Sequence, residues 1–248
     1  MKKVLITAGA SGIGRAMGEA FEASGHEVWV TDVNAGALDS LPKSWHAHHA
    51  NAVDETAMSA VIGEMAQVDV LCANAGIAGP TAQIEDIEIA DWRACVSVNL
   101  EGAFIAAKHA TPLMKAAGRG AIVLTSSTAG IYGYPNRAPY AAAKWAIIGL
   151  MKTLAMELGP YGISANAICP GAVEGERMEG VLAREAAAKG MTRDQVYDGY
   201  AVGTSMRRFV EAQDIANMAV FLGSDAARFV SGQVIAVDGH TENPDPKV

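Results

Sequence analysis

Short apolar runs alternate with longer helix-like stretches along most of this chain. The expected strands are Val4–Thr7, Val28–Thr31, Val68–Cys72, Ala121–Ser126, Ile163–Ile168 and Val234–Val237, with a weaker one near Trp45–Ala50. The expected helices are Gly14–Ser24, Glu55–Met65, Ile89–Ala117, Pro139–Leu158 and Ala212–Leu222. Continuous apolar strands separated by helices indicate a parallel sheet covered on both faces. Right-handed crossovers then predict a doubly wound α/β fold of about seven strands.

The alternation runs evenly enough to predict one domain. The chain has 248 residues, and no linker, low-complexity stretch or internal repeat divides it, so we expect residues 1–248 to fold as one unit. The exception to the alternation is the segment 174–209, which is helix-rich and dense in Met, Arg and Glu. Long excursions from a compact sheet often form lids or binding loops, and we expect this one to be the substrate loop.

The composition argues against several kinds of partner. The formal net charge is −8 and basic residues cluster only in pairs, so we expect no nucleic-acid partner. No apolar run approaches the roughly 20 residues that a membrane-spanning helix needs, so we expect no membrane contact. The N-terminal apolar run Val4–Ile6 is too short for a secretion signal. We therefore expect a cytoplasmic protein.

The residues that most often bind metals are not grouped. Cys72, Cys95 and Cys169 are far apart, with neither a disulfide framework nor a zinc-site spacing. Three histidines fall in the short polar segment His46–His49, without a carboxylate or cysteine beside them. We expect a partly exposed strand there and no metal site.

A glycine-rich turn, Thr7–Gly14, directly follows the first strand and opens the first helix. Glycines allow the backbone to approach a pyrophosphate, and the helix N-terminus supplies free N–H groups. This position favours nucleotide binding over an ordinary strand–helix turn. The residues expected at the nucleotide are Gly9, Ser11, Gly12, Ile13 and Gly14.

The end of the second strand indicates which nucleotide binds. Asp32 can accept hydrogen bonds from ribose hydroxyls and would repel the extra phosphate of NADP. No Arg or Lys occupies positions 31 to 36, so we expect NAD as the cofactor. Asn51, with Ala52 beside it, follows the third strand and could contact adenine or simply form a turn.

Small residues follow two later strands. Asn74, Ala75 and Gly76 come after the fourth strand, and Pro170 and Gly171 come after the sixth. Because ligands bind at the carboxyl ends of strands in open α/β sheets, we expect both sets beside the cofactor.

Tyr140 and Lys144 lie four residues apart in a helix-like run and so share one face. A phenol of ordinary pKa, about 10, is a poor base at neutral pH. A nearby ammonium lowers that pKa, and Tyr140 could then exchange a proton with a substrate hydroxyl. Taken alone, this spacing is common on solvated helix faces.

Two other polar residues strengthen the catalytic interpretation. Ser127 ends the fifth strand, where its hydroxyl could hold a substrate oxygen. Asn99 is expected inside a helix, where its carboxamide competes for backbone hydrogen bonds. Such a residue can break one helical bond and hold a water molecule.

Together these motifs resemble the short-chain dehydrogenase/reductase family, from Val4 to Gly239. The resemblance also includes Ser231-Gly232-Gln233 and the following Val237-Asp238-Gly239. It implies a Rossmann-type fold, an oxidoreductase that uses NAD(P), and a homotetramer assembled through the long helices that contain Asn99 and Tyr140–Lys144.

The resemblance also implies a role for each matching residue. Tyr140 would be the acid/base, and Lys144 would bind the nicotinamide ribose and lower the Tyr140 pKa. Ser127 would stabilise the substrate oxygen, and Asn99 would hold a water in a proton relay to Lys144. The backbone around Val173 would bind the nicotinamide carboxamide.

The chain departs from the family pattern at several positions. Ala8 replaces the first glycine of the turn, with Gly9 next to it, so the turn is expected to be reshaped. Gly175 stands where a threonine commonly touches the carboxamide, which would loosen the entrance to the substrate loop. The remaining departures are Asn51, Ala73 and His240.

The main functional hypothesis is the NAD-dependent interconversion of a secondary alcohol and a ketone in a single dinucleotide-binding and catalytic domain. One alternative is an NADPH-linked ketone or oxoacyl reductase, and another is a nucleotide-sensing protein without turnover. The substrate stays open, because loop side chains determine it. A pocket that mixes Met and Tyr with arginine would suit a small hydroxy acid, a polyol or a cyclic alcohol. Residues weighed for this pocket are Tyr132, Tyr134, Arg177, Met178, Met191, Met206, Arg207 and Arg208.

Overall fold

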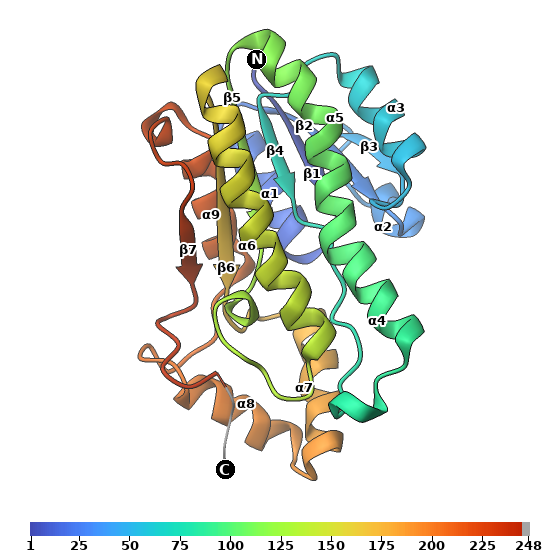
Figure 1. Cartoon of the computed structure of the whole chain (residues 1–248), viewed down its shortest axis with the longest axis vertical. Helices are drawn as coiled ribbons and strands as arrows, with labels where there is room; N and C mark the ends of the chain where they lie inside the picture. The colour runs from blue at the N-terminus through green and yellow to red at the C-terminus, as the bar shows by residue number, and fades with distance from the viewer. Residues whose placement is uncertain (245–248) are drawn as a thin grey trace.

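Seven strands form one parallel sheet in the computed structural model, which describes residues 1–244 (Figure 1). The order is β3-β2-β1-β4-β5-β6-β7 and every neighbouring pair is parallel, which confirms the predicted doubly wound sheet. The chain leaves β1 toward β2 and returns beside β1 with β4, so a crevice forms at their carboxyl ends. The strands are β1 (Lys3–Thr7), β2 (Glu27–Asp32), β3 (His46–His49), β4 (Val70–Ala73), β5 (Gly120–Thr125), β6 (Ile163–Pro170) and β7 (Val234–Val237).

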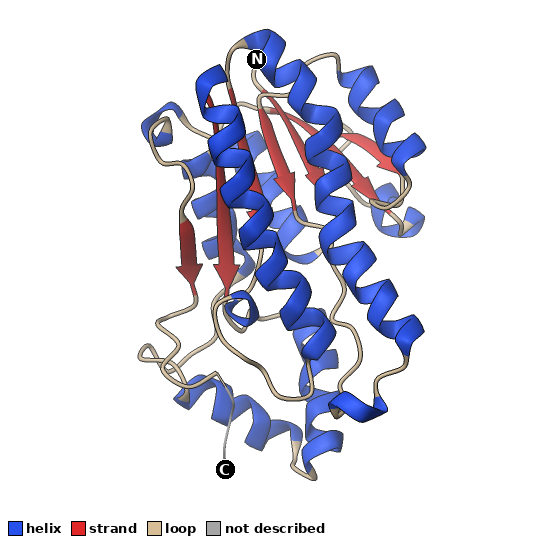
Figure 2. Cartoon of the chain, viewed as in Figure 1, coloured by secondary structure: helices blue, strands red, loops and turns tan. Residues whose placement is uncertain are grey.

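Helices cover both faces of the sheet (Figure 2). One face carries α1 (Gly12–Ala23), α2 (Ala35–Asp39) and α9 (Ala212–Leu222). The other carries α3 (Glu55–Met65), α4 (Ile89–Val96), α5 (Gly102–Ala117) and α6 (Ala138–Leu158). Beyond the carboxyl ends of the strands lie α7 (Glu176–Lys189) and α8 (Arg193–Val202), at the bottom of Figure 1. Within residues 1–244, no helix combines the length and the apolarity needed to cross a bilayer.

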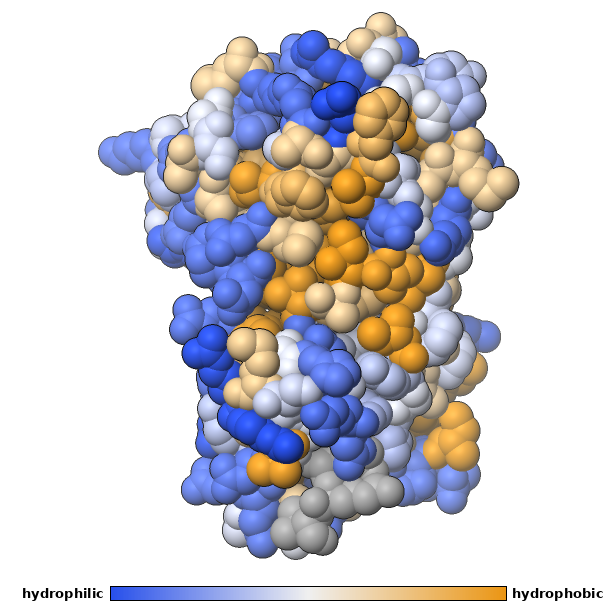
Figure 3. All heavy atoms as spheres, turned by 90° about the vertical axis from the view of Figure 1, so that its left-hand side faces the viewer, coloured by the Kyte–Doolittle hydropathy of each residue, from blue (hydrophilic) through white to orange (hydrophobic). Residues whose placement is uncertain are grey.

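The strand β7 forms one edge of the sheet, and among residues 1–244 it pairs only with β6. Its side chains are only partly covered. The side of the molecule on which this strand lies shows a band of apolar residues across its middle (Figure 3). Contiguous apolar surface of this kind is typical of protein–protein contacts.

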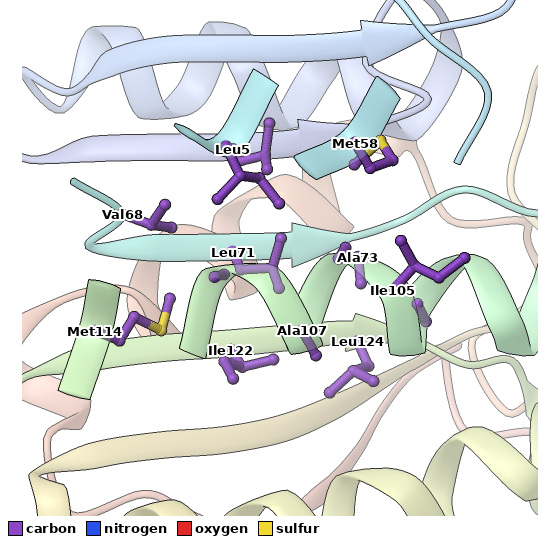
Figure 4. Close-up of a cluster of buried hydrophobic side chains, with 14 of the residues drawn as sticks. Leu5, Met58, Val68, Leu71, Ala73, Ile105, Ala107, Met114, Ile122 and Leu124 are labelled. Carbon is purple, nitrogen blue, oxygen red and sulfur yellow. The ribbon is translucent and has the colours of Figure 1, made fainter. Parts of the chain in front are cut away.

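Two apolar cores follow from the alternation of side chains along the strands. Leu5 points into the core under α3, α5 and α6, where it lies near Leu71 and Met58 (Figure 4). Val4 and Ile6 point to the opposite face and pack under α1 and α9. All five side chains are almost fully buried, and each such burial contributes roughly 1.5–3 kcal/mol. The two cores hold the strand ends in fixed positions around the crevice.

The helix predicted over Ile89–Ala117 is wrong as one continuous element. The structure has α4, then a π-helical turn over Ser97–Glu101, then α5. The cause is the Asn99 carboxamide, whose Nδ2 donates to the Cys95 carbonyl (2.8 Å) and to the Ile77 carbonyl (2.9 Å). The side chain thus competes for a carbonyl that the helix would otherwise use.

Most other boundaries shift by one or two residues. The weak strand expected near Trp45–Ala50 is the exposed β3, and the fourth strand begins at Val70 rather than Val68. The segment 174–209 forms the pair α7 and α8, which share a small core of their own. That core contains Leu182, Ala186, Val196, Tyr200 and Phe209.

The glycine-rich turn holds Ala8 and Gly9 under two different constraints. Ala8 adopts a φ of 52°, in the left-handed region that favours glycine, which costs a non-glycine residue about 1 kcal/mol. A Cβ at Gly9 would lie 2.5 Å from Cγ1 of Val30, so the second position must be glycine for packing. At Gly14, a Cβ would lie 2.1 Å from the Ala8 carbonyl oxygen.

Replacing Gly14 by alanine should therefore damage the fold at the turn. We expect Gly14→Ala to lower the free energy of unfolding by about 1–3 kcal/mol, because backbone must move to admit the methyl group. The matched control is Gly63→Ala in α3, where a Cβ meets nothing within 4 Å and alanine should stabilise the helix by up to about 1 kcal/mol. Chemical denaturation measures both changes, and equal effects at the two positions would contradict the packing argument.

Candidate active site

A cavity of about 730 Å³ lies at the carboxyl ends of the strands, between the glycine-rich turn and α7. Its size suits a small-molecule site. Most of the residues expected at the site line it, although they come from distant parts of the sequence. These are Ser11, Gly12, Ile13, Gly14, Asp32, Asn74, Gly76, Ser127, Tyr140, Lys144, Pro170, Gly171 and Val173.

Five expected residues are not on the cavity wall. Gly9 packs against Val30, and the methyl group of Ala52 lies beneath Gly102. The Asn51 Oδ1 accepts a hydrogen bond from the Val53 N–H (3.2 Å), as in an ordinary turn. Ala75 and Asn99 lie behind the wall. Direct nucleotide contact by Gly9, Asn51, Ala52 or Ala75 stays a prediction.

The buried Asp32 carboxylate is fixed at the nucleotide end of the cavity. Its Oδ2 accepts from the Ala10 N–H (3.1 Å) and its Oδ1 from the Asn34 N–H (3.0 Å). These bonds hold a negative charge between the glycine-rich turn and the end of β2. Each carboxylate oxygen retains acceptor capacity for a further hydroxyl.

A single hydroxyl group ties the ends of β1 and β4 together. The Thr7 Oγ1 accepts from the backbone N–H groups of Asn74 (3.0 Å) and Ala75 (2.9 Å). The Asn74 Nδ2 donates back to the Thr7 carbonyl (3.3 Å), and its Oδ1 accepts from Thr125 (3.2 Å). Asn74 thus braces three neighbouring strand ends. Sequence analysis missed Thr7 and Thr125, although both stand at the last position of an expected strand or next to it.

Tyr140 lies in the first turn of α6 and faces the cavity. Burial alone would raise the pKa of its phenol. The positive charges of Lys144 and Arg177, together with the hydrogen bond from Ser127, outweigh burial and lower the pKa below its ordinary value. The Lys144 ammonium stands 5.6 Å from the centre of the phenol ring. Tyr140 can therefore deprotonate more readily than a free tyrosine.

Lys144 is almost fully buried one turn farther along α6. Its Nζ donates to the Thr125 carbonyl (2.8 Å), and the Ser126 Oγ donates to the Lys144 carbonyl (2.8 Å). Burial lowers the pKa of the ammonium, and the neighbouring Tyr140 opposes that effect. These contacts set Lys144 at the junction of β5 and α6.

Ser127 stands two residues beyond the end of β5, so the prediction that it ends the strand is wrong. It precedes a short 3₁₀ turn, Thr128–Gly130, and its Oγ accepts from the Ala129 N–H (3.1 Å). The same hydroxyl reaches Tyr140. Because the turn fixes its hydroxyl, Ser127 can hold an oxygen atom in front of the phenol.

Asn99 presents its carbonyl oxygen to the space beside Lys144. Within residues 1–244, this buried Oδ1 has no hydrogen-bond partner. A Cβ built on Gly76 would lie 2.5 Å from the Asn99 Oδ1 and 3.3 Å from the Lys144 Nζ. Glycine at position 76 thus keeps open the space between the amide and the ammonium.

The sixth strand and the segment after it form the wall opposite α6. A Cβ at Gly171 would meet the Asp238 backbone at 2.9 Å, so this position also requires glycine. The Val173 residue bridges to Val210, with Glu174 N–H donating to Val210 and Val210 N–H donating to Ala172. This pairing leaves the N–H and C=O of Val173 facing away from Val210, and Val173 is among the residues that line the cavity.

The substrate end of the cavity contains some of the residues weighed from sequence. Tyr134, Arg177 and Met178 line the cavity. Tyr132 instead donates to the Thr241 carbonyl (3.1 Å), and Met206 is largely exposed. The sequence analysis missed Arg137, Val181, Arg184 and Tyr200, which also line the cavity. Arg137 could have been suspected from its place three residues before Tyr140.

Comparisons with known proteins agree with this geometry. A family model described as Enoyl-(Acyl carrier protein) reductase matches residues 7–240. The trans-4-hydroxycyclohexanecarboxylate dehydrogenase of Sinomonas cyclohexanicum is 34% identical over 96% of this chain and 92% of its own. The 3-oxoacyl-[acyl-carrier-protein] reductase FabG of Thermotoga maritima is 34% identical over 96% of each chain. The crystal structure of an NAD⁺-bound xylitol dehydrogenase superposes with a TM-score of 0.92, at 28% identity over 96% of this chain and 98% of that one.

The lowered pKa of Tyr140 can be measured directly. In the native protein one tyrosine should ionise at a lower pH than an ordinary phenol of pKa about 10, because the pKa of Tyr140 is lowered, and this ionisation should form a separate early phase of the tyrosinate absorbance. Tyr140→Phe should remove this early phase, and Lys144→Met should move it to higher pH. The control is Tyr134→Phe, since burial raises the pKa of Tyr134 to about 12. An early phase that survives in Tyr140→Phe would refute the assignment.

Proposed function

The chain belongs to the short-chain dehydrogenase/reductase family, and we propose that it interconverts a secondary alcohol and a ketone with NAD as its cofactor. The observation that carries the proposal is the convergence of Ser127, Tyr140 and Lys144 at one wall of the cavity. Its relatives include dehydrogenases of hydroxycyclohexanecarboxylate and of xylitol, so the reaction class is that of an oxidoreductase acting on CH–OH groups.

In this mechanism the side chains of the protein hold the substrate and move its hydroxyl proton. Ser127 holds the substrate hydroxyl, and Tyr140 removes its proton because the nearby cations favour the phenolate. Lys144 supports the phenolate electrostatically. The Asn99 Oδ1 can hold a water next to Lys144, which gives the proton a route away from Tyr140. NAD, when bound, supplies the hydride acceptor.

The residues at the other end of the cavity fit a dinucleotide. The first turn of α1 offers free N–H groups to a pyrophosphate, and Gly12 has open space where a Cβ would point. Asp32 can accept hydrogen bonds from the adenosine ribose. The backbone of Val173 can bind the nicotinamide carboxamide, and Lys144 can donate to the nicotinamide ribose.

We propose NAD rather than NADP because of the Asp32 carboxylate. A 2′-phosphate beside this buried charge would be repelled, and neither Val33 nor Asn34 offers a compensating cation. An NADPH-linked oxoacyl reductase is the second candidate, favoured by the likeness to the Thermotoga maritima reductase.

We also propose that the enzyme is a cytoplasmic homotetramer. Phe104 on α5 and Trp145 and Met156 on α6 are large apolar side chains left at least half exposed, which suits contact between copies through these helices. The apolar band beside β7 offers a second contact surface (Figure 3). All three cysteines are free thiols, as in proteins of a reducing compartment.

Replacing Tyr140 tests the catalytic proposal. We expect Tyr140→Phe to lower turnover of alcohols by a factor on the order of 10²–10⁴, since the acid/base group is lost while the ring stays. NADH binding, followed by nicotinamide fluorescence, should change little. The control is Tyr161→Phe in the short 3₁₀ turn after the far end of α6, which should keep full activity. Near-normal turnover in Tyr140→Phe would end the proposal.

A nucleotide titration tests the cofactor assignment. The native protein should bind NADH more tightly than NADPH, and Asp32→Asn should shrink this preference by on the order of tenfold, because the neutral amide neither repels phosphate nor makes charge-assisted bonds. Asp39→Asn on the exposed end of α2 removes the same charge outside the cavity and should leave the preference intact. Tighter NADPH binding by the native protein would favour the oxoacyl-reductase alternative.

A further inference from the structure

The Arg137 side chain is a buried cation on the wall of the cavity. Only 8% of the residue is exposed. Its Nη2 donates to the Ala78 carbonyl (3.3 Å), whereas its Nε is buried without a hydrogen-bond partner. Among residues 1–244, Arg137 forms no ion pair with any carboxylate. Burying a charge without a counter-charge is costly, so the side chain needs an anion that the described chain does not supply.

The acidic residues around the cavity either bond to groups other than Arg137 or are exposed. The buried Glu185 accepts from the Tyr200 hydroxyl (2.7 Å) and pairs with Lys189 (2.8 Å). Glu174 accepts from the Tyr197 hydroxyl (2.8 Å). Glu176 lines the cavity but is exposed at the start of α7. None of these carboxylates neutralises Arg137, so the cavity keeps a positive charge at this point.

Arg137 stands directly beside the reactive phenol. Its guanidinium carbon lies 4.7 Å from the centre of the Tyr140 ring. The position is rigid, because Arg137 directly precedes α6 and its carbonyl accepts from the Ala141 N–H (2.9 Å). An anion bound to this guanidinium would therefore sit a short distance from a hydroxyl held by Ser127 and Tyr140.

We propose that the substrate is a short hydroxy acid whose carboxylate is bound by Arg137. The inference rests on the proposed function, because it takes Tyr140 as the group that receives the hydroxyl proton. A guanidinium matches a carboxylate with two parallel N–H donors, so Arg137 selects both the charge and the orientation of the substrate. Arg177 and Arg184 on α7 add positive charge to the same cavity and favour entry of an anion.

A role in tuning Tyr140 alone does not account for Arg137. Lys144 and Arg177 each lower the pKa of Tyr140 more than Arg137 does. A residue present only for tuning would also affect charged and neutral substrates alike. Discrimination between a carboxylate and its neutral analogue is therefore the property that identifies an anion-binding role.

The test compares two ligands of one shape that differ in charge. Isothermal titration calorimetry of the full chain, with and without NADH, measures the binding of cyclohexanecarboxylate and of cyclohexanecarboxamide. We expect the native protein to prefer the carboxylate, and Arg137→Met to weaken carboxylate binding by on the order of 10²-fold with little change for the carboxamide. Arg137→Lys should recover part of the lost carboxylate affinity, since lysine restores the positive charge but not the two parallel N–H donors of the guanidinium.

A matched control removes one positive charge elsewhere. Arg228 is exposed near the amino ends of the strands, on the side of the sheet away from the cavity. Arg228→Met should leave the affinities for the carboxylate and for the carboxamide unchanged. Unchanged NADH affinity in Arg137→Met shows that the cavity keeps its shape. A native protein without preference for the carboxylate, or an equal loss for both ligands in Arg137→Met, would overturn the inference.

Turnover separates this inference from the function on which it rests. If the native enzyme oxidises cyclohexanol and 4-hydroxycyclohexanecarboxylate equally well, the dehydrogenase stands and the anion site is refuted. If neither compound is oxidised but Arg137 still discriminates between the two calorimetric ligands, the anion site is supported and the dehydrogenase proposal fails. If the native enzyme has a higher kcat/KM for 4-hydroxycyclohexanecarboxylate than for cyclohexanol, and Arg137→Met abolishes this difference, both the dehydrogenase proposal and the anion site are supported.

Discussion

The buried ammonium of Lys144 is the interaction around which the site is organised. A cation away from water is tolerated only when polar groups surround it, and here the Thr125 carbonyl accepts a hydrogen bond from the Lys144 ammonium. Ser126 fastens the same turn of α6 to the end of β5. Gly76 leaves space beside the ammonium, and Asn99 directs its free carbonyl oxygen there. The lowered pKa of Tyr140 depends on this arrangement, because without Lys144 burial of the phenol would act with less opposition.

The sheet brings these groups together because all its strands run in one direction. The last residues of every strand therefore lie along the same side of the sheet, and the packing of the two cores fixes the position of each strand end. The Thr7 hydroxyl and Asn74 then join three of the strand ends by hydrogen bonds. The glycine-rich turn and the region around Lys144 are thereby linked through the ends of β1, β4 and β5.

The substrate end of the cavity is built differently from these strand ends. It combines α7 and α8, which have their own small core, with side chains from the loop before α6. The positive charges there come from two separate elements, Arg137 next to the rigid α6 and Arg177 on α7. In the proposal made above, Arg137 holds the anionic group of the substrate near the Tyr140 phenol. Arg177 on α7 adds a second positive charge to the cavity. We therefore propose that substrate selection depends on the junction between the loop before α6 and the helices α7 and α8.

The sequence by itself determined the sheet, the glycine-rich turn and the candidate catalytic residues, because apolar periodicity and helical spacing are local properties. Tyr140 and Lys144 share a face for the simple reason that they lie one turn apart. Only the tertiary structure decided which carbonyl groups the Asn99 carboxamide binds, that Ser127 lies beyond the strand, and that Gly9 packs against Val30 instead of lining the cavity. It alone revealed Arg137 as a cation without a counter-charge in the described chain. Whether a charge has a partner depends on contacts between segments far apart in the sequence, and no local pattern records them.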